Sequence, residues 1–250
     1  MFDLEKLKKN REKSIDVIQS SKFHQFIHAD IIDRLEPLDK EFNEILIIKP
    51  AIEKLITEHI EAISSNSNIT YISKLDENMP KDKFDLIVFP LGFHWISDIK
   101  TFLSQIKSTL KENGIFICSF PGAGTLRKLR LQLIELEASN KIAHTPHISP
   151  FIQFEQLTPI LQHSGFIENI IDMEPLELEY DTPLDLMKAL KNHGEANILT
   201  AGANYSITKK MYNELGSAAE KPFSDLINLI TFISSPKKNS IKLKFEHYQG

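Results

Sequence analysis

Cysteine is almost absent from this chain of 250 residues, since Cys118 is the single one. One thiol cannot close an intrachain disulfide, and it cannot supply a metal site that is built from several thiolates. The sequence therefore excludes a disulfide framework and a thiolate-rich metal centre.

Long apolar runs are missing as well. No segment approaches the roughly 18 residues that a membrane-spanning helix requires. The first residues, "MFDLEKLKKN", lack the apolar centre of a signal peptide. We therefore expect no membrane span and a cytoplasmic location.

The chain also has no excess of positive charge. Lys and Arg number 29 against 34 Asp and Glu, which gives a net charge of -5. A charge of this sign repels nucleic acid. Basic residues do gather in Lys6–Arg11 and in Lys237–Lys244, but acidic residues flank the first group, as on a solvated helix face. We expect no nucleic-acid partner.

What the sequence does contain is an alternation of short apolar β runs and amphipathic helices. This alternation implies a doubly wound parallel sheet with right-handed crossovers. Asp98 is placed to cap one helix, and Asn113-Gly114 to end it. The expected strands are 44–50, 69–73, 84–91, 115–120, 165–173 and 226–235, and the expected helices are 3–35 (one or two), 51–63, 99–110, 123–139, 154–163, 184–191 and 208–215.

The same pattern suggests how the chain is divided. We predict an N-terminal helical segment over residues 1–40, followed by one α/β domain over 41–236. A helical insertion near 182–220 precedes the last strand of that domain, and a basic tail occupies 237–250.

Three motifs link the sequence to a known family. The stretch "FDLIVFPLGFHWISD", with "LKENGIF" after it, resembles the fourth-to-fifth-strand core of class I S-adenosylmethionine methyltransferases. "PHISPF" (Pro146–Phe151) and "DLMKALKNHGEAN" (Asp185–Asn197) narrow the resemblance to the methyltransferase-like complex I assembly factors of mitochondria and their bacterial relatives. The resemblance covers about residues 80–236. It implies a class I methyltransferase-like (Rossmann-like) three-layer α/β sandwich.

The resemblance also implies a chemistry. The family is credited with hydroxylating an arginine on a complex I subunit, although its fold is that of a methyltransferase. It implies S-adenosylmethionine as cofactor and a protein, such as a complex I subunit, as partner.

The residues at the expected cofactor contacts differ from the family pattern. A glycine-rich loop normally follows the first strand, because only glycine lets the backbone approach the cofactor closely. Here Lys49, Pro50 and Ala51 stand in its place, and Pro50 has no N–H to donate. Leu75 stands where an adenine-side aspartate is expected, with Asp76 one position away. We expect that S-adenosylmethionine is not bound in the conventional way.

The spacing points in the same direction. Residues 50–83 lie between Lys49 and Phe84. Two complete helix-and-strand crossovers need about 45 residues or more, so one crossover fits. We expect the second strand of the family to be missing, which leaves a shortened, mostly parallel sheet of about five or six strands.

The retained motifs supply the candidate site. The resemblance implies a substrate or partner face, and we expect its three elements to converge. The alternative is that Trp95 packs under the next helix and that Glu195 and Asn197 belong to a helix-ending turn. The candidate residues are His94, Trp95, His147, Ser149, Phe151, Glu195 and Asn197.

Other chemical readings have less support. His144 and His147 share a loop, but no cysteine or H-E-x-x-H helix accompanies them, so we predict no metal site. "FPGAGT" before a helix suits an anion, yet it matches no phosphate-binding motif and fits a tight turn. Cys118 lies in an apolar strand and fits a small core residue.

Three functions remain open from the sequence. The chain is a methyltransferase-family protein that acts on or with a protein partner in complex I assembly, an active S-adenosylmethionine-dependent methyltransferase with a rebuilt cofactor loop, or a non-enzymatic interaction module. The sequence assigns no catalytic residue, no named partner and no oligomeric state.

Overall fold

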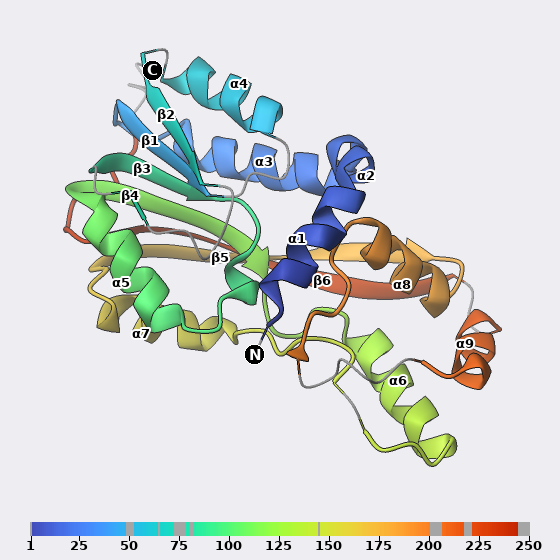
Figure 1. Ribbon diagram of the computed structural model, residues 1–250. Helices are drawn as coiled ribbons and strands as arrows, with labels where there is room; N and C mark the ends of the chain where they lie inside the picture. Colours follow the sequence, from blue (N-terminus) through green and yellow to red (C-terminus); the bar gives the residue numbers. More distant parts are fainter. Residues whose placement is uncertain are drawn as a thin grey trace, which may run out of the picture. The chain divides into compact units, whose positions relative to one another are not determined.

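The computed structural model describes residues 2–48, 53–64, 66–72, 79–80, 83–144, 146–200, 207–217 and 222–244. Within these ranges the chain forms a six-stranded sheet in the order β2-β1-β3-β4-β6-β5 (Figure 1). The strands are β1 (Glu44–Ile48), β2 (Asn68–Ile72), β3 (Phe84–Phe89), β4 (Leu110–Pro121), β5 (Glu168–Tyr180) and β6 (Phe223–Ser235).

Helices alternate with these strands, and the predicted α/β class is confirmed. α3 and α4 lie on one side of β1 and β3, and α5 and α7 lie on the other (Figure 1). The helices are α1 (Leu4–Lys13), α2 (Ile15–Ser20), α3 (Lys22–Leu35), α4 (Glu53–Ile63), the 3-10 turn η1 (Phe93–Trp95), α5 (Ile99–Thr109), α6 (Arg127–Ser139), α7 (Phe154–His163), α8 (Pro183–Asn192) and α9 (Lys209–Gly216).

The central strands are parallel and buried on both faces. β1 pairs in parallel with β2 and β3, and β3 pairs in parallel with β4. All six residues of β3 are buried. Continuous apolar strands are what a parallel sheet covered on both sides requires.

Asp85 is the charged residue of β3. Burial alone would raise the pKa of Asp85, but hydrogen bonds from Lys111 and from the backbone of Glu44 and Asn43 bring that pKa below its ordinary value.

The elements found between β1 and β3 agree with the single crossover that the spacing predicts. In the described part of the chain, one helix (α4) and one strand (β2) lie between β1 and β3. β2 pairs directly with β1, from Glu44 opposite Asn68 to Ile48 opposite Ile72. Among the described residues, β2 is therefore the one strand outside β1.

The predicted boundary between α5 and β4 is wrong. α5 ends at Thr109, and Asn113-Gly114 lies inside β4. Leu110 faces Phe84 and Ile115 faces Leu86, so residues 111–114 form a bulge opposite a single residue. A Cβ on Gly114 would lie 2.9 Å from the Phe84 carbonyl oxygen, which explains why glycine occupies this position.

β5 and β6 are both longer than predicted. β5 continues past residue 173 to Tyr180, and β6 begins at Phe223 rather than at 226. The added half of β5 reads "LELEY", in which Leu178 and Tyr180 pack inward and the glutamates are exposed. Pro175 is tolerated because β5 is an edge strand.

The chain forms two compact units. Unit 1 comprises Met1–Ser20, Pro121–Ile152 and Glu174–Leu229, and unit 2 comprises Ser21–Phe120, Gln153–Met173 and Ile230–Gly250. The domain boundaries at residues 40 and 236 stay a prediction. No helix in the described ranges is both long and apolar enough to cross a membrane.

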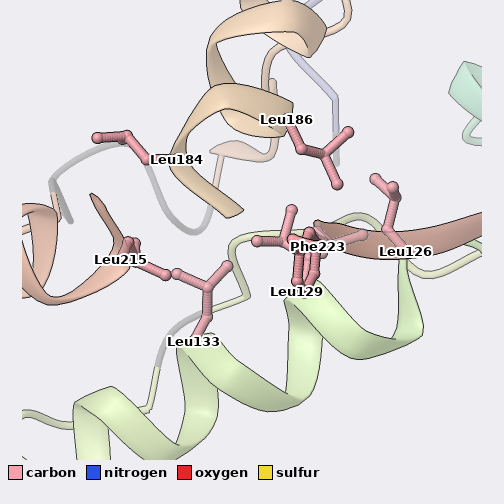
Figure 2. Packing of buried hydrophobic residues seen from close by; sticks show 8 residues of the cluster. Leu126, Leu129, Leu133, Leu184, Leu186, Leu215 and Phe223 are labelled. Atoms are coloured by element: carbon pink, nitrogen blue, oxygen red, sulfur yellow. The ribbon is translucent and has the colours of Figure 1, made fainter. Parts of the chain in front are cut away.

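Each unit has its own apolar core. In unit 2, the Phe93 ring contacts the rings of Phe102, Phe120 and Phe232. In unit 1, α6, α8, α9 and the start of β6 enclose a cluster that is rich in leucine (Figure 2). The buried members of this leucine cluster are Leu126, Leu129, Leu133, Ile148, Leu184, Leu186, Leu215 and Phe223.

Candidate functional site

His94 and Trp95 lie just after the carboxyl end of β3, in the turn η1. The turn depends on Gly92, because a Cβ there would lie 2.7 Å from the Phe89 ring. His94 and Trp95 are both buried, and their ring centroids are 4.6 Å apart. The two residues stand at the predicted edge of the sheet, packed within unit 2.

The turn before α6 offers no open anion site. The Asp225 carboxylate, which comes from β6 and is buried, accepts a hydrogen bond from the Leu129 N–H at 2.8 Å and one from the Lys128 N–H at 3.3 Å. The chain's own carboxylate therefore occupies the position that a bound anion would take at this helix end. This geometry agrees with the prediction of a tight strand-to-helix turn.

The loop after α6 lies against a buried carboxylate that the sequence analysis did not single out. Glu137 is 2% exposed, and its two oxygens contact two histidines. His144 Nδ1 lies 2.9 Å from Oε2, and His147 Nε2 lies 2.8 Å from Oε1. A signal for Glu137 was present, because it extends the buried stripe of Leu126, Leu129 and Leu133 along one face of α6.

Arg130, about two turns before Glu137 on α6, holds the same loop. Its guanidinium donates to the carbonyl oxygens of Ile148 at 3.2 Å and Ser149 at 3.0 Å. Burial lowers the pKa of this guanidinium. The Ser149 side chain is buried, and its Oγ has no hydrogen-bond partner in the described ranges. Phe151 packs against the leucine cluster.

The "GEAN" turn connects this loop to the N-terminal helix. Asn197 Nδ2 donates to the Pro146 carbonyl at 2.7 Å, and Lys6 Nζ donates to the Asn197 carbonyl at 3.1 Å. Glu195 Oε1 accepts from Arg11 Nε at 2.9 Å and from Nη2 at 2.6 Å. Glu195 and Asn197 therefore join α1 to the loop that carries His147.

Unit 1 thus brings together five of the seven candidate residues. We call Arg130, Glu137, His144, His147 and Asn197 the loop-anchor cluster, since these residues fix the loop between α6 and α7. His94 and Trp95 belong to unit 2. The convergence of all three elements on one face stays a prediction.

The positions of the predicted cofactor contacts lie outside the described residues. These are Lys49, Pro50 and Ala51 after β1, and Leu75 and Asp76 after β2. Across the described ranges, no three or more side chains of His, Cys, Asp and Glu are grouped so that they could hold a metal ion. Burial raises the pKa of the Cys118 thiol well above its ordinary value, so this residue is not suited to act as a nucleophile.

Comparisons with known proteins give a consistent set of similarities. A family model described as "Methyltransferase domain" matches residues 15–167. A Rickettsia prowazekii protein named "Putative methyltransferase RP459" is 47% identical over 171 residues, which are 68% of this chain and 75% of that protein.

Two further relatives carry the name "Arginine-hydroxylase NDUFAF5, mitochondrial". The Danio rerio protein is 28% identical over 253 residues, covering 87% of this chain and 78% of its own. The Rattus norvegicus protein is 34% identical over 146 residues, covering 57% of this chain and 43% of its own. Among solved structures, the YcgJ protein of Bacillus subtilis is 14% identical with a TM-score of 0.47, covering 88% of this chain and 100% of its own.

Proposed function

The chain belongs to the family of methyltransferase domains, and we propose that it acts on or with a protein partner in the assembly of respiratory complex I, by modification of an arginine side chain. One observation carries this proposal. The Danio rerio relative named as an arginine hydroxylase aligns with 87% of this chain and over 78% of its own length. A similarity of this extent includes both compact units.

The crossover between β1 and β3 supports a role apart from conventional methyl transfer. One strand lies outside β1 in the described part of the chain, whereas the family pattern leads us to expect two. The sequence between Ile48 and Glu53, residues 49–52, contains no glycine. Both features reduce the fit of S-adenosylmethionine, because its amino-acid and ribose groups normally use these segments.

Hydroxylation and methylation need different co-substrates. Hydroxylation adds one oxygen atom to the side chain, so it needs an oxidant such as dioxygen together with two electrons from a reductant. Methylation needs S-adenosylmethionine as the methyl donor. Membership in the methyltransferase family favours the active methyltransferase as second candidate, and a purely structural interaction module is the third.

Mass spectrometry of a partner separates these candidates. We would co-express the chain with each hydrophilic complex I subunit from the same organism and compare the arginine-containing peptides with and without the chain. A gain of one oxygen atom on one arginine supports the proposal, and a gain of one methyl group supports the methyltransferase. Stable co-purification with no modification supports the interaction module.

Absence of both modification and co-purification with every subunit would overturn the proposal. The exposed residue His163 provides a matched control, because it lies on α7, away from the candidate residues in the sequence. His163→Gln should behave as wild type in each of these assays.

A further inference from the structure

The carboxylate of Glu137 determines which ring nitrogen carries the proton in two histidines. We take Glu137 as ionised, because two imidazoles lie within hydrogen-bond distance of its oxygens; an ionised carboxylate only accepts hydrogen bonds, so each imidazole donates to it. His147 therefore donates from Nε2–H, and His144 donates from Nδ1–H. In neutral His144 the lone pair must then lie on Nε2.

His144 is the exposed member of this group. Its side chain is 63% exposed, whereas the side chains of His147 and Glu137 are 14% and 3% exposed. In the described part of the chain, no hydrogen bond occupies His144 Nε2. We propose that His144 is a general base whose Nε2, oriented by Glu137, accepts a proton from an O–H or N–H group of a molecule bound at this loop.

Other contacts fix the nearby segment of the loop. Arg130 binds the backbone at Ile148 and Ser149, and Asn197 binds it at Pro146. His147 attaches the same segment to the second oxygen of Glu137. The hydrogen bond from His144 to Glu137 orients the His144 ring before a substrate binds, which lowers the entropic cost of proton transfer.

The proton balance is simple. The substrate's O–H or N–H bond breaks, the proton forms a bond to Nε2, and the electron pair stays on the substrate oxygen or nitrogen. The imidazolium that results lies 2.9 Å from the Glu137 carboxylate, which stabilises it. Arrangements of this kind contribute about 10²–10⁴-fold to proton-transfer steps.

The nucleophile has to come from the bound molecule or from water. Ser149 Oγ is hydrogen-bonded to neither imidazole, since it has no hydrogen-bond partner in the described ranges, and Cys118 is completely buried in β4. The geometry therefore points to a carboxylate–histidine pair rather than to a hydrolytic triad. This assignment does not depend on the complex I proposal, because any acceptor with an acidic O–H or N–H would use the same nitrogen.

Hydrolysis of p-nitrophenyl acetate measures the Nε2 lone pair directly. Nε2 attacks the acetyl carbon, p-nitrophenolate leaves, and water then hydrolyses the acetyl-imidazole to acetate and free imidazole. His163 is the matched comparison, because it is also exposed and its Nδ1 also contacts an acceptor, but that acceptor is the neutral Pro159 carbonyl rather than a carboxylate. We expect His144→Gln to lower the second-order rate constant at neutral pH by a larger factor than His163→Gln does, because the Glu137 carboxylate makes the His144 imidazole the stronger base.

Equal rates for wild type and His144→Gln would overturn the proposal. Nitrogen-15 NMR of the wild-type rings provides a test that needs no variant. We expect His144 in the Nδ1–H form and His147 in the Nε2–H form, and the opposite form for His144 would also overturn the proposal. Glu137→Gln should then populate both forms of His144 and reduce the rate.

Discussion

Gly194 adopts a backbone conformation that other residues reach only at a cost. Its φ is +75°, and a Cβ built on it would lie 2.9 Å from the Cα of Arg11. We predict that Gly194→Ala lowers the free energy of unfolding by about 1–3 kcal/mol, because the left-handed region disfavours a side chain and because backbone atoms cannot move aside easily. Urea denaturation measures the change.

Gly216 provides the matched control for that substitution. It ends α9, and its added Cβ would meet only a side-chain methyl of Leu184 at 3.3 Å. Gly216→Ala should change the free energy of unfolding by less than about 0.5 kcal/mol. Equal effects at both glycines would contradict the explanation based on the approach of α1.

His28 makes stability depend on pH. It is buried in α3, where desolvation and then the charge of His59 lower its pKa from 6.5 to about 4. Between these two values the unfolded state binds more protons than the folded state does, so the free energy of unfolding falls as pH falls. We predict a loss of about 2 kcal/mol between about pH 7.5 and pH 5 from this residue.

Urea titrations at the two pH values test this prediction. His28→Leu removes the titrating group and should reduce the difference in stability between the two pH values by about that amount. His163→Leu, at an exposed position, should retain the full difference. An undiminished pH dependence in His28→Leu would assign the effect to other groups.

At the scale of elements, α6 depends on a carboxylate from a distant strand. Asp225 accepts hydrogen bonds from the N–H groups of Lys128 and Leu129. We predict that Asp225→Ala lowers the free energy of unfolding by about 1–3 kcal/mol, since it leaves buried donors at a helix N-terminus without partners. Asp225→Asn, which keeps one acceptor oxygen, should cost less.

The neighbouring residue separates this capping effect from a general effect of altering the strand. Ser224 is exposed, and its hydroxyl oxygen accepts a hydrogen bond from Lys128 Nζ at 3.1 Å. Ser224→Ala should therefore be nearly neutral in the same chemical denaturation experiment. A cost at Ser224 as large as that at Asp225 would mean that the strand, rather than the cap, is affected.

At the scale of the whole molecule, the substituted cofactor segments should weaken the affinity for S-adenosylmethionine. We expect S-adenosylmethionine to bind weakly or not at all, because Lys49–Ala51 and Leu75 replace residues that normally share the binding energy. Each lost charged hydrogen bond costs about 1.5–3 kcal/mol, so two or three losses reduce the affinity by several orders of magnitude. Calorimetric titration that gave a micromolar dissociation constant would favour the active methyltransferase instead.

His147 is a partly buried residue, with 14% of its side chain exposed. Its Nε2 contacts the buried Glu137 carboxylate, so we predict that His147→Ala removes a hydrogen bond to a buried charged group and costs about 1–3 kcal/mol. Assays of partner binding with this variant therefore need a parallel measurement of stability.

The sequence by itself determined the class of fold and most of its elements. Apolar runs such as Phe84–Phe89 identify central parallel strands, because a strand buried on both faces has no polar side to show. The interval from Lys49 to Phe84 limited the chain to one crossover, since each strand and helix needs a minimum length. Local periodicity and chain length carry this information directly.

Only the tertiary structure decided which residues contact the candidate residues of unit 1. The sequence pointed to His147, but it did not pair that residue with Glu137, ten positions earlier, or connect Asn197 to Pro146. It also placed Asn113-Gly114 at a helix end, whereas a bulge opposite Asp85 includes both residues in β4. These features depend on which segments meet in space, and a buried carboxylate selects its partners among whatever the fold brings within hydrogen-bond distance.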